Sequence, residues 1–477
     1  MRTLLHYLIA SILILPLITF SQVLVDSSIE GTASNDNYGR SVSLSENGST
    51  LAIGGEGFNN FSGAARVYEN QGGTWTQIGS DIIGDDEQHQ LGTSLSLSAD
   101  GSILAVGAPA GNSYLGYVRI LENQGGTWVE IGRFDGTDFN AILGESVDIS
   151  SEGNFLAVGA YNYSSGRGYV KVYENQGGTW TKIGGDLYGD NAGDQFGYQV
   201  DISSDGSIVA VAARGHNAAT GQVKVFQFQS TDWAQLGNDL VGENNDDRFN
   251  RISLSGSGTV IAVGAPNHNG TSGSDSGHVR VFEYQEGNWV QIGSEIEGEA
   301  PNDGLGTSIS LSSNGSVLAV GSISHNSRTG YTKVYKNISG VWTSIGSDIN
   351  GESAGDLSGT SLSLSSDGSF VAIGEVGNDS NGSFTGQARV FDLSGVLSTE
   401  YNVLSQSKIY PNPVKNEFNI DLAEGIELLE LNIYNSLGQH LISTNKTLVK
   451  TANLSKGLYS VEIKTNSGST IKKVIIY

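Results

Sequence analysis

Short runs of alternating apolar and small polar residues recur along most of the chain. One such run has the form Leu-Ala-Val-Gly, as at Leu104 to Gly107, where large and small side chains alternate with a period of two. A period of two predicts β-strands, because successive side chains of a strand point to opposite faces. Turn residues such as Asp100-Gly101 separate these runs at short intervals. The pattern therefore predicts an all-β chain of short strands joined by tight turns.

A unit of about fifty residues repeats seven times. Each copy contains a first strand, a tight turn with Gly, a strand of the Leu-Ala-Val-Gly type, a variable loop, a third strand, a second Gly turn and a strand with Trp. Four strands joined mostly by hairpins predict one blade of a β-propeller. The first strands begin at Ser41, Ser94, Ser146, Gln199, Arg251, Ser308 and Ser361.

The two ends of the repeat region are complementary. The seventh copy stops after Phe391 and lacks a fourth strand, whereas the segment before the first copy contains Ser28-Ile29-Glu30-Gly31, which matches Asp81-Ile82-Ile83-Gly84. An open ring would leave an exposed strand edge. We therefore expect residues 22–395 to form a seven-bladed β-propeller closed by its N-terminal strand.

The N-terminus predicts a signal peptide over residues 1–21. Arg2 supplies the positive end, Leu4 to Phe20 is largely apolar, and Ser21-Gln22 suits cleavage. A membrane anchor is the alternative, but no Lys/Arg cluster follows to act as a stop signal. No other segment has the length to span a bilayer, so the mature chain is expected to have no transmembrane segment.

Charge and cysteine content exclude several functions. The chain has 50 Asp and Glu against 25 Lys and Arg, for a net charge of −25. Such an acidic body repels phosphate backbones and anionic lipids, so nucleic acid and membrane surfaces are poor partners. The absence of cysteine excludes disulfides, thiolate metal sites and a lipidated N-terminal Cys.

The repeats resemble the FG-GAP or integrin-α-type propeller repeats of bacterial surface proteins, over residues 23–395. Phe196-Gly197 keeps the first half of that motif, and Gly107-Ala108-Pro109 and Gly264-Ala265-Pro266 match the second half. Degenerate first halves occur at Tyr38-Gly39, Leu91-Gly92, Leu143-Gly144 and Leu305-Gly306. Many members of this family hold Ca²⁺ between the first two strands. Here that turn offers one acidic residue, as at Asp100, and one carboxylate cannot build a calcium shell.

A different pattern begins at Lys408. Tyr410-Pro411-Asn412-Pro413 opens a run of alternating strands that ends with Lys472-Lys473 and Tyr477, and Gly438 and Gly457 lie between them. This region, residues 408–477, resembles the type A C-terminal sorting domain of the type IX secretion system. The resemblance implies an immunoglobulin-like β-sandwich, the type IX machinery as partner, and a protein that is secreted to the outer-membrane surface or the extracellular space. An ordinary small β-sandwich is the alternative. Residues 396–407 lose the repeat and are interpreted as a linker.

Two sets of residues recur once per repeat and are interpreted as structural. One Trp per repeat, in six copies, is assigned to the core between blades rather than to sugar stacking. A basic residue occupies one strand position in all seven copies and is assigned to salt bridges with nearby acids. The Trp set is Trp75, Trp128, Trp180, Trp233, Trp289 and Trp342; the basic set is Arg66, Arg119, Lys171, Lys224, Arg280, Lys333 and Arg389; the expected acids are Asp81, Asp186, Asp239, Glu295 and Asp348.

The variable loops carry the candidate ligand-binding side chains. Function tends to lie in loops that vary on a repeated frame, and these loops share a face with acidic connections between the repeats. The candidates are Tyr114, Tyr161, Tyr163, His216, His268 and His325. Residues on successive blades are spread around a ring, so we expect the three histidines not to converge on a metal, and no cofactor is predicted. The Asn that follows each of these histidines is interpreted as a turn cap.

The sequence favours a binding or adhesion module on the cell surface over an enzyme. Different loops on one frame suit recognition of an extracellular protein or glycan. A polysaccharide-acting enzyme is the alternative, but a glycosidase needs two carboxylates at a defined separation, and no pair that departs from the repeat is evident. No catalytic residue is predicted. A passive surface-layer component is the third hypothesis.

Overall fold

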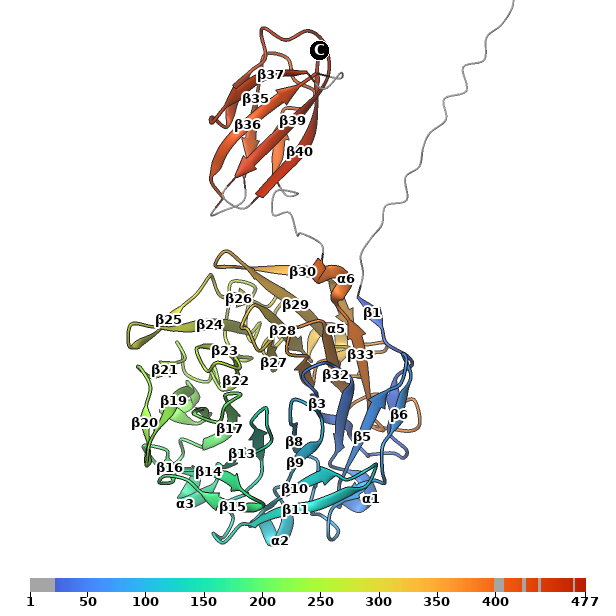
Figure 1. Cartoon of the computed structure of the whole chain (residues 1–477), viewed down its shortest axis with the longest axis vertical. Coiled ribbons are helices and arrows are strands. Elements are labelled where there is room, and N and C mark those ends of the chain that lie inside the picture. The colour runs from blue at the N-terminus through green and yellow to red at the C-terminus, as the bar shows by residue number, and fades with distance from the viewer. Residues whose placement is uncertain (1–21, 399–406, 423–425, 436–438, 466–467) are drawn as a thin grey trace, which may run out of the picture.

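The computed structural model describes residues 22–398, 407–422, 426–435, 439–465 and 468–477. The predicted signal peptide, most of the predicted linker and Gly438 lie outside these residues. The described chain is all-β, and its strands form antiparallel sheets. Seven sheets, numbered here in the order of their first strands, come from residues 22–392, and Figure 1 shows them set around a common centre.

Six of the seven sheets run in chain order from the innermost to the outermost strand, and in sheet 7 the N-terminal strands form the outer edge. Sheet 1 contains β3 (Tyr38–Leu44), β4 (Thr50–Gly55), β5 (Ala64–Asn70), β6 (Trp75–Gln77) and β7 (Ile82–Ile83). Sheet 2 contains β8 (Ser94–Leu97), β9 (Ile103–Ala108), β10 (Tyr117–Asn123) and β11 (Trp128–Asp135). Sheet 3 contains β12 (Ser146–Ile149), β13 (Phe155–Ala160), β14 (Tyr169–Gln176), β15 (Thr179–Lys182) and β16 (Leu187–Tyr188).

The other four sheets repeat this order. Sheet 4 contains β17 (Phe196–Ile202), β18 (Ile208–Ala213), β19 (Gln222–Gln229), β20 (Asp232–Gln235) and β21 (Leu240–Val241). Sheet 5 contains β22 (Arg251–Leu254), β23 (Val260–Ala265), β24 (His278–Gln285), β25 (Asn288–Gln291) and β26 (Ile296–Glu297). Sheet 6 contains β27 (Ser308–Leu311), β28 (Val317–Ser322), β29 (Tyr331–Ile338) and β30 (Val341–Asn350). Sheet 7 contains β31 (Ser361–Leu364), β32 (Phe370–Glu375) and β33 (Gln387–Asp392), with β1 (Val23–Leu24) and β2 (Ile29–Glu30) both paired to β33.

The hydrophobic core is divided among the boundaries between consecutive sheets. Every residue of β4, β18 and β28 is buried, because each second strand has a neighbouring sheet on both faces. Seven clusters of buried side chains lie one at each boundary, and the cluster that contains Val42 of sheet 1 and Val390 of sheet 7 joins the two ends of the series. The sheets therefore form a closed ring.

A cycle of backbone hydrogen bonds closes the ring at the turn that follows each innermost strand. In each turn one N–H donates to the carbonyl of the corresponding residue in the next sheet, at 2.8–3.1 Å. The seven residues, in order around the cycle, are Glu46, Ala99, Ser151, Ser204, Gly256, Ser313 and Ser366, whose N–H donates back to Glu46. Seven equal steps return to the start, so the ring contains seven units.

The N-terminal segment completes the last sheet, as predicted. Val23 pairs with Asp392 in β1, and Ile29 pairs with Ala388 in β2. Asp26, between these strands, accepts a hydrogen bond from the backbone N–H of Trp75 at 3.0 Å. The chain's first strands therefore occupy the place of the missing fourth strand.

Five short helical turns lie between the second and third strands of sheets 1, 2, 3, 4 and 6. They are α1 (Phe58–Phe61), α2 (Gly111–Tyr114), α3 (Tyr163–Gly166), α4 (His216–Ala219) and α5 (His325–Arg328). Asn59, Asn112, Asn217 and Asn326 have φ of 47–53°. At these four positions a left-handed backbone, which Asn tolerates better than most residues, explains the Asn, whereas Asn269 acts as the predicted side-chain cap and accepts the backbone N–H of Asp275 at 2.9 Å.

The predicted linker begins later than expected. Residues Ser394–Ser398 form α6, and Val396 is buried in the core between sheets 6 and 7. Packing of this apolar side chain therefore extends the ring to residue 398.

Residues 407–477 form a second unit of two antiparallel sheets with one shared core. One sheet contains β34 (Lys408–Tyr410), β35 (Glu417–Asp421) and β38 (Leu448–Lys450). The other contains β37 (His440–Thr444), β36 (Leu428–Tyr434), β39 (Gly457–Thr465) and β40 (Gly468–Ile476). Phe418 and Val461, one from each sheet, are at most 1% exposed in this core. Among the described residues, no helix has the length and apolar character needed to cross a membrane.

Candidate functional site

The second-to-last residue of every innermost strand ties its sheet to the next one. Its side-chain oxygen accepts the backbone N–H of the last residue in the following innermost strand, at 2.8–3.2 Å. The seven residues are Ser43, Ser96, Asp148, Asp201, Ser253, Ser310 and Ser363. The small polar residues of these strands thus serve as hydrogen-bond acceptors, in addition to leaving room for the adjacent backbone.

Two of these seven positions hold aspartate, and the two are adjacent. Asp148 and Asp201 hydrogen-bond to each other, so one of them carries a proton. Burial raises the pKa of both groups, and the nearby Asp148 charge raises that of Asp201 further. A glycosidase separates its two carboxylates by about 5–9.5 Å. Carboxyl groups in direct contact do not meet that requirement, so this pair belongs to the inter-sheet contacts.

A polar cavity of about 300 Å³ lies on the ring axis and is lined by all seven innermost strands. Seven of its lining residues are Ser41, Thr93, Ser94, Thr307, Ser308, Thr360 and Ser361. Arg40, Glu145, Tyr198 and Arg251 also line it. The volume lies at the lower end of the range for small-ligand pockets.

Charged and aromatic side chains gather at one end of this cavity. Two guanidinium groups lie over the ring of Tyr198, that of Arg214 at 4.8 Å and that of Arg251 at 5.3 Å from the ring centroid. Tyr161 meets the same ring edge-on, with the centroids 5.6 Å apart. Arg40 donates to Glu56 at 3.1 Å. We call Arg40, Glu56, Glu145, Tyr161, Tyr198, Arg214 and Arg251 the mouth cluster.

The members of the mouth cluster come from departures from the repeat. The residue four places before the last residue of the innermost strand is Thr in three sheets, but it is Arg40 in sheet 1, Glu145 in sheet 3, Tyr198 in sheet 4 and Asn250 in sheet 5. The residue three places before the last one is Ser in five sheets, Gln199 in sheet 4 and Arg251 in sheet 5. The residues that depart from the repeat lie close together only because the ring brings the starts of the innermost strands together. Sequence reasoning missed them, although aligning the seven copies at these two positions would have singled them out.

The electrostatics of the mouth cluster are unusual for so acidic a chain. Burial alone would raise the pKa of Tyr198, but the charges of Arg251 and Arg214 outweigh it and lower this pKa. Burial raises the pKa of Glu145, and Arg40 opposes the shift. Within the described residues, neither Arg214 nor Arg251 takes part in an ion pair or a hydrogen bond, and the Arg251 Nε is buried without a partner. Neither guanidinium group is in a direct ion pair among these residues, and Glu145 is the carboxylate of the cluster that interacts electrostatically with both.

Of the six predicted ligand-binding residues, one belongs to the mouth cluster. That residue is Tyr161. Tyr114 is 56% exposed at the end of α2, and Tyr163 packs against Tyr169 with ring centroids 5.1 Å apart. Among the described residues, no two of the six are in contact through a hydrogen bond, an ion pair or a pair of rings. The structure does not bring them into one site.

The three predicted histidines each lie beside a buried aspartate. The Nδ1–carboxylate distances are 3.5 Å for His216–Asp194, 3.2 Å for His268–Asp247 and 2.9 Å for His325–Asp303. These aspartates also accept backbone N–H groups of their own loop; Asn244, for example, donates to Asp247 at 2.7 Å. The same position holds Asp36 and Asp356. An aspartate two residues before the position of the Phe in the Phe-Gly motif, which Tyr38, Phe196, Phe249, Leu305 and Ser358 occupy, is therefore a loop anchor that the sequence reasoning missed.

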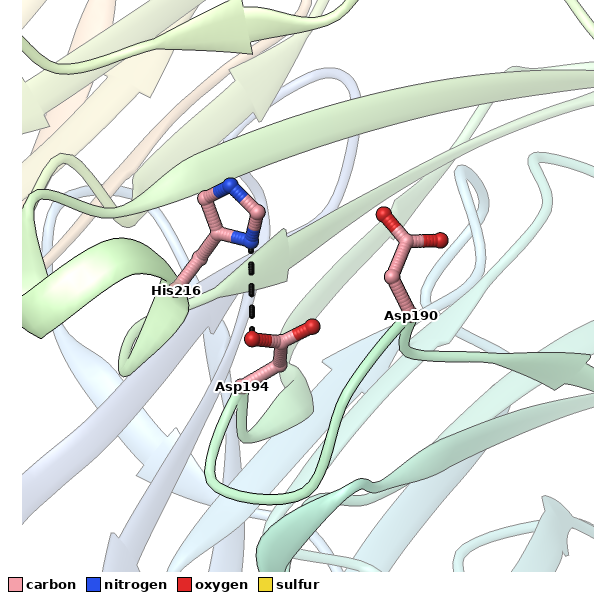
Figure 2. Close-up of side chains that lie close together, drawn as sticks. All are labelled: Asp190, Asp194 and His216. Carbon is pink, nitrogen blue, oxygen red and sulfur yellow. Dashed lines mark ion pairs between the residues drawn. The ribbon is translucent and has the colours of Figure 1, made fainter.

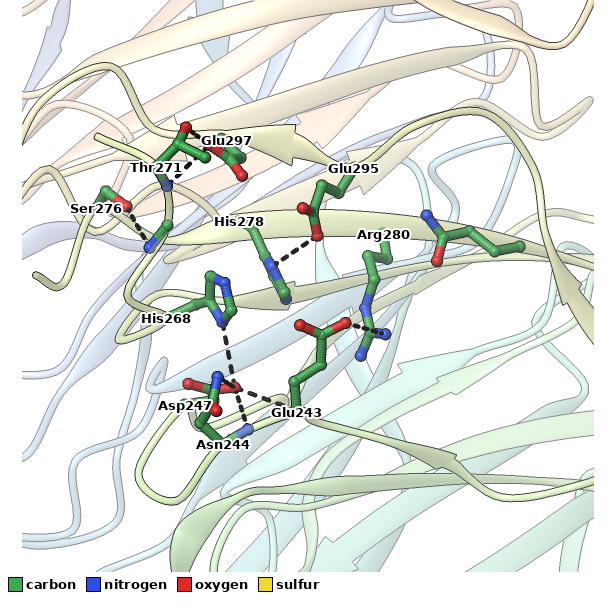
Figure 3. Close-up of polar contacts among 12 residues, drawn as sticks. Glu243, Asn244, Asp247, His268, Thr271, Ser276, His278, Arg280, Glu295 and Glu297 are labelled. Atoms are coloured by element: carbon green, nitrogen blue, oxygen red, sulfur yellow. Dashed lines mark hydrogen bonds and ion pairs between the residues drawn. The ribbon is translucent and has the colours of Figure 1, made fainter. Parts of the chain in front are cut away.

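In sheet 5 a second histidine joins this arrangement, as Figure 3 shows. The rings of His268 and His278 are stacked with centroids 3.9 Å apart, and His278 lies 3.3 Å from Glu295. His278 is fully buried, and burial, with the nearby His268 and Arg280, lowers its pKa to about 3. His278 is therefore neutral at physiological pH.

One group of side chains has the spacing of metal ligands. Asp190, Asp194 and His216 each place one ligand atom within 4.8 Å of the others (Figure 2). However, the ammonium of Lys224 contacts both oxygens of Asp190 at 2.7 and 2.8 Å, and Asp194 accepts the N–H of Asn191 at 2.8 Å. Both carboxylates already have partners, so we assign this group to loop structure.

Half of the tryptophans carry an indole hydrogen bond to the neighbouring sheet. The Nε1 groups of Trp128, Trp233 and Trp289 donate to backbone carbonyls of the preceding sheet at 2.8–3.2 Å. A Cβ added at Gly184 would lie 2.6 Å from Trp233. The tryptophans thus pack between sheets, as the sequence indicated.

The basic residues mostly form ion pairs, but often with other acids than expected. Arg66–Asp81 at 2.9 Å and Lys333–Asp348 at 3.6 Å agree with the expectation. Four basic residues contact acids that were not expected. These pairs are Arg119–Asp85, Lys224–Asp190, Arg280–Glu243 and Lys333–Glu299. These acids lie in the connection that enters each sheet, which runs beside the third strand of that sheet. Lys171 lies 4.5 Å from the ring centroid of Tyr169, Arg119 also contacts Glu130, and Arg389 pairs with the buried Glu375.

In the C-terminal unit, the predicted sorting residues join its first strand to its last. Asn412 donates from Nδ2 to the Lys473 carbonyl at 2.9 Å and accepts the Ile475 N–H at 3.0 Å. Pro411 and Pro413, on either side of it, follow cis peptide bonds. Tyr410 accepts a hydrogen bond from Asn419. Gly457 begins β39, and Lys472 and Lys473 lie on β40 opposite Val461 and Ser460.

Comparison with known proteins identifies the C-terminal unit and the general fold. Residues 408–477 match the secretion system C-terminal sorting domain family. No curated protein matches the chain. Among solved structures, the hydrazine synthase of Kuenenia stuttgartiensis is similar, with a TM-score of 0.51 and 13% identity over 73% of this chain and 94% of that one. At this identity the likeness concerns the fold alone.

The sorting domain defines the class of protein. A type IX sorting domain at residues 408–477 directs export by the type IX secretion system. The protein is therefore secreted and lies at the cell surface or in the extracellular space.

Proposed function

We propose that residues 22–398 form a seven-bladed β-propeller of the FG-GAP type that binds an extracellular ligand at its mouth cluster. The C-terminal unit, an immunoglobulin-like sandwich, acts as the export address. The β-propeller-like hydrazine synthase and the closed cycle of seven sheets support this fold. The protein thus acts outside the cell as a recognition module.

One observation carries the binding proposal. At the axial cavity, small repeat residues are replaced by Arg40, Glu145, Tyr198 and Arg251, and none of these four is needed to close the ring. Sheets 2, 6 and 7 close with Thr and Ser at the same two positions. The buried Nε of Arg251 has no hydrogen-bond partner among the described residues, and a buried polar group without a partner costs stability, so a ligand that contacts Arg251 best explains the presence of this residue.

The test compares the secreted protein, residues 22–477, with a double variant that restores the repeat residues, R40T/R251S. Both are applied to arrays of glycans and extracellular matrix proteins. We expect the wild type to capture a defined ligand and the double variant to lose it, while both keep the same circular dichroism spectrum. Equal capture by both proteins would place recognition elsewhere and contradict the proposal.

A polysaccharide-acting enzyme is the second candidate, because Tyr198 has the features of a catalytic base. Its pKa is lowered by two arginines, and strongly perturbed groups in a cavity are common at active sites. If this function is correct, incubation of the protein with captured polysaccharide will release shorter chains, and Y198F will abolish the release. Capture with no change in chain length would exclude it.

A further inference from the structure

The hydroxyl groups around the axial cavity determine which hydrogen-bonding groups a ligand needs. Ser41, Ser94, Ser308 and Ser361 donate their protons to backbone carbonyls of the next sheet at 2.5–2.8 Å. Thr93, Thr307 and Thr360 donate to carbonyls of their own loops at 2.7–2.8 Å. A hydroxyl has one proton and two lone pairs. All seven therefore offer only acceptors to the cavity, and the ligand must supply hydrogen-bond donors.

The arginines of the mouth cluster define a second requirement. Arg251 lines the cavity, and Arg214 lies with it over the ring of Tyr198. Neither arginine forms an ion pair in the part of the chain that the structure describes. Arg40 adds a third guanidinium that already pairs with Glu56. A planar guanidinium fork matches a carboxylate with two parallel hydrogen bonds. The mouth cluster has three guanidinium groups against the two carboxylates of Glu56 and Glu145, so an anionic group on the ligand would balance its remaining positive charge.

We infer that the ligand contains a uronic-acid unit, with its carboxylate on Arg251 and its hydroxyls directed to the serine and threonine oxygens. This inference rests on the proposed binding function and specifies its ligand class. A sugar acid combines several O–H donors with one carboxylate in a compact unit. A peptide carries fewer donors for its size and is anchored mainly by apolar contacts, which this polar lining lacks.

The test is calorimetric titration of the secreted protein, residues 22–477, with trisaccharides of galacturonate, glucuronate and mannuronate. Each is compared with its methyl ester, which keeps the hydroxyls and removes the charge. A pentaglutamate peptide supplies carboxylates without sugar hydroxyls. We expect one uronate to bind, and its ester and the peptide to bind at least tenfold more weakly.

Two variants locate the site. R251S introduces the residue found at this position in five sheets, so it preserves the fold, and it is expected to weaken uronate binding at least tenfold. R248A removes the same charge from an exposed arginine that pairs with Asp246, and it is expected to change binding by less than twofold. Thermal unfolding of both variants checks the fold.

Several results would overturn the inference. Ester or pentaglutamate binding as tight as uronate binding would do so, as would R251S binding at wild-type strength. If the arrays capture a neutral glycan or a protein through the mouth cluster while no uronate binds, the binding function stands and the ligand class is wrong. If nothing binds in either experiment, both proposals fail together.

Discussion

Asp148 and Asp201 hydrogen-bond to each other at the boundary between sheets 3 and 4, where every other boundary has at least one serine in the same pair of positions. Their carboxyl groups still accept the backbone N–H groups of Ile202 and Leu254, at 2.8 Å each. The hydrogen bonds between the sheets are therefore kept, and the two carboxyl groups share one proton.

This proton makes stability depend on pH. Burial raises the pKa of both groups above the ordinary value, so the folded chain retains a proton that the unfolded chain releases above about pH 4. Stability then falls as pH rises through the folded pKa. We expect D201S to raise the Tm by about 2–4 °C at pH 8, which corresponds to about 1 kcal/mol in a large domain, and to change it little at pH 5.

The matched control is S310A. It removes the acceptor of the Leu364 N–H without removing a titratable group, so its Tm loss should be the same at both pH values. A D201S effect that is likewise independent of pH would show that the shared proton has no energetic role.

His278 predicts a loss of stability on acidification. Its folded pKa of about 3 lies below the ordinary 6.5, so between these values the unfolded chain binds the proton and the folded chain does not. At pH 5 this costs about 2 kcal/mol relative to pH 7. The variant H278Q should lose this part of the pH dependence, as measured by urea unfolding at both pH values.

Glutamine is a suitable replacement because sheet 4 already uses it. Gln222 occupies the corresponding position and donates to Asp239 at 2.8 Å, and Glu295 is placed to accept in the same way in H278Q. H89Q, which removes a half-buried histidine in a loop of sheet 2, serves as control. If H278Q unfolds with the wild-type pH profile, the assignment of the effect to His278 is wrong.

Removal of residues 22–31 should open the ring. The loss of β1 and β2 leaves the outer edge of β33 unpaired and uncovers Val42 and Val390 at the boundary between sheets 7 and 1. An unpaired edge promotes aggregation. We expect a Tm lower by more than 10 °C and aggregates in size-exclusion chromatography. Truncation after residue 398 is the control, because it keeps β1; equal behaviour of the two truncations would argue against closure by the N-terminal strand.

Asn412 should be important for the fold of the sorting domain and hence for export. N412A removes two hydrogen bonds to β40, at about 1 kcal/mol each, and we expect a severalfold loss of surface-exposed protein with accumulation in the periplasm. N419A removes an exposed contact to Tyr410 and should export normally. Surface labelling with an antibody to the ring measures both. Normal display of N412A would separate this asparagine from export.

Much of the fold could be predicted because it depends on local patterns. First strands begin at Ser94, Ser146, Arg251, Ser308 and Ser361 as expected. The missing fourth strand and the matching N-terminal segment together indicated closure. These features follow from strand periodicity, from turn chemistry and from the cost of an open edge, which can all be read within or between neighbouring repeats.

The mouth cluster could not be predicted because it depends on geometry across repeats. Arg40 and Arg251 are 211 positions apart in the sequence and line the same cavity. Whether such residues meet depends on the number of sheets and on the tilt of the innermost strands. The partner of Lys224 could not be predicted for the same reason. Lys224 pairs with Asp190 and not with Asp239 because of the path of the connection between sheets.

The position of β1 also bears on the maturation of the protein after export. Because the last sheet is completed by the beginning of the chain, no strand pair of the ring involves residues beyond Asp392. A protease that cuts after residue 398 would therefore break no sheet and expose no strand edge. The export address is detachable, and the molecule left at the surface after its removal retains its complete recognition face.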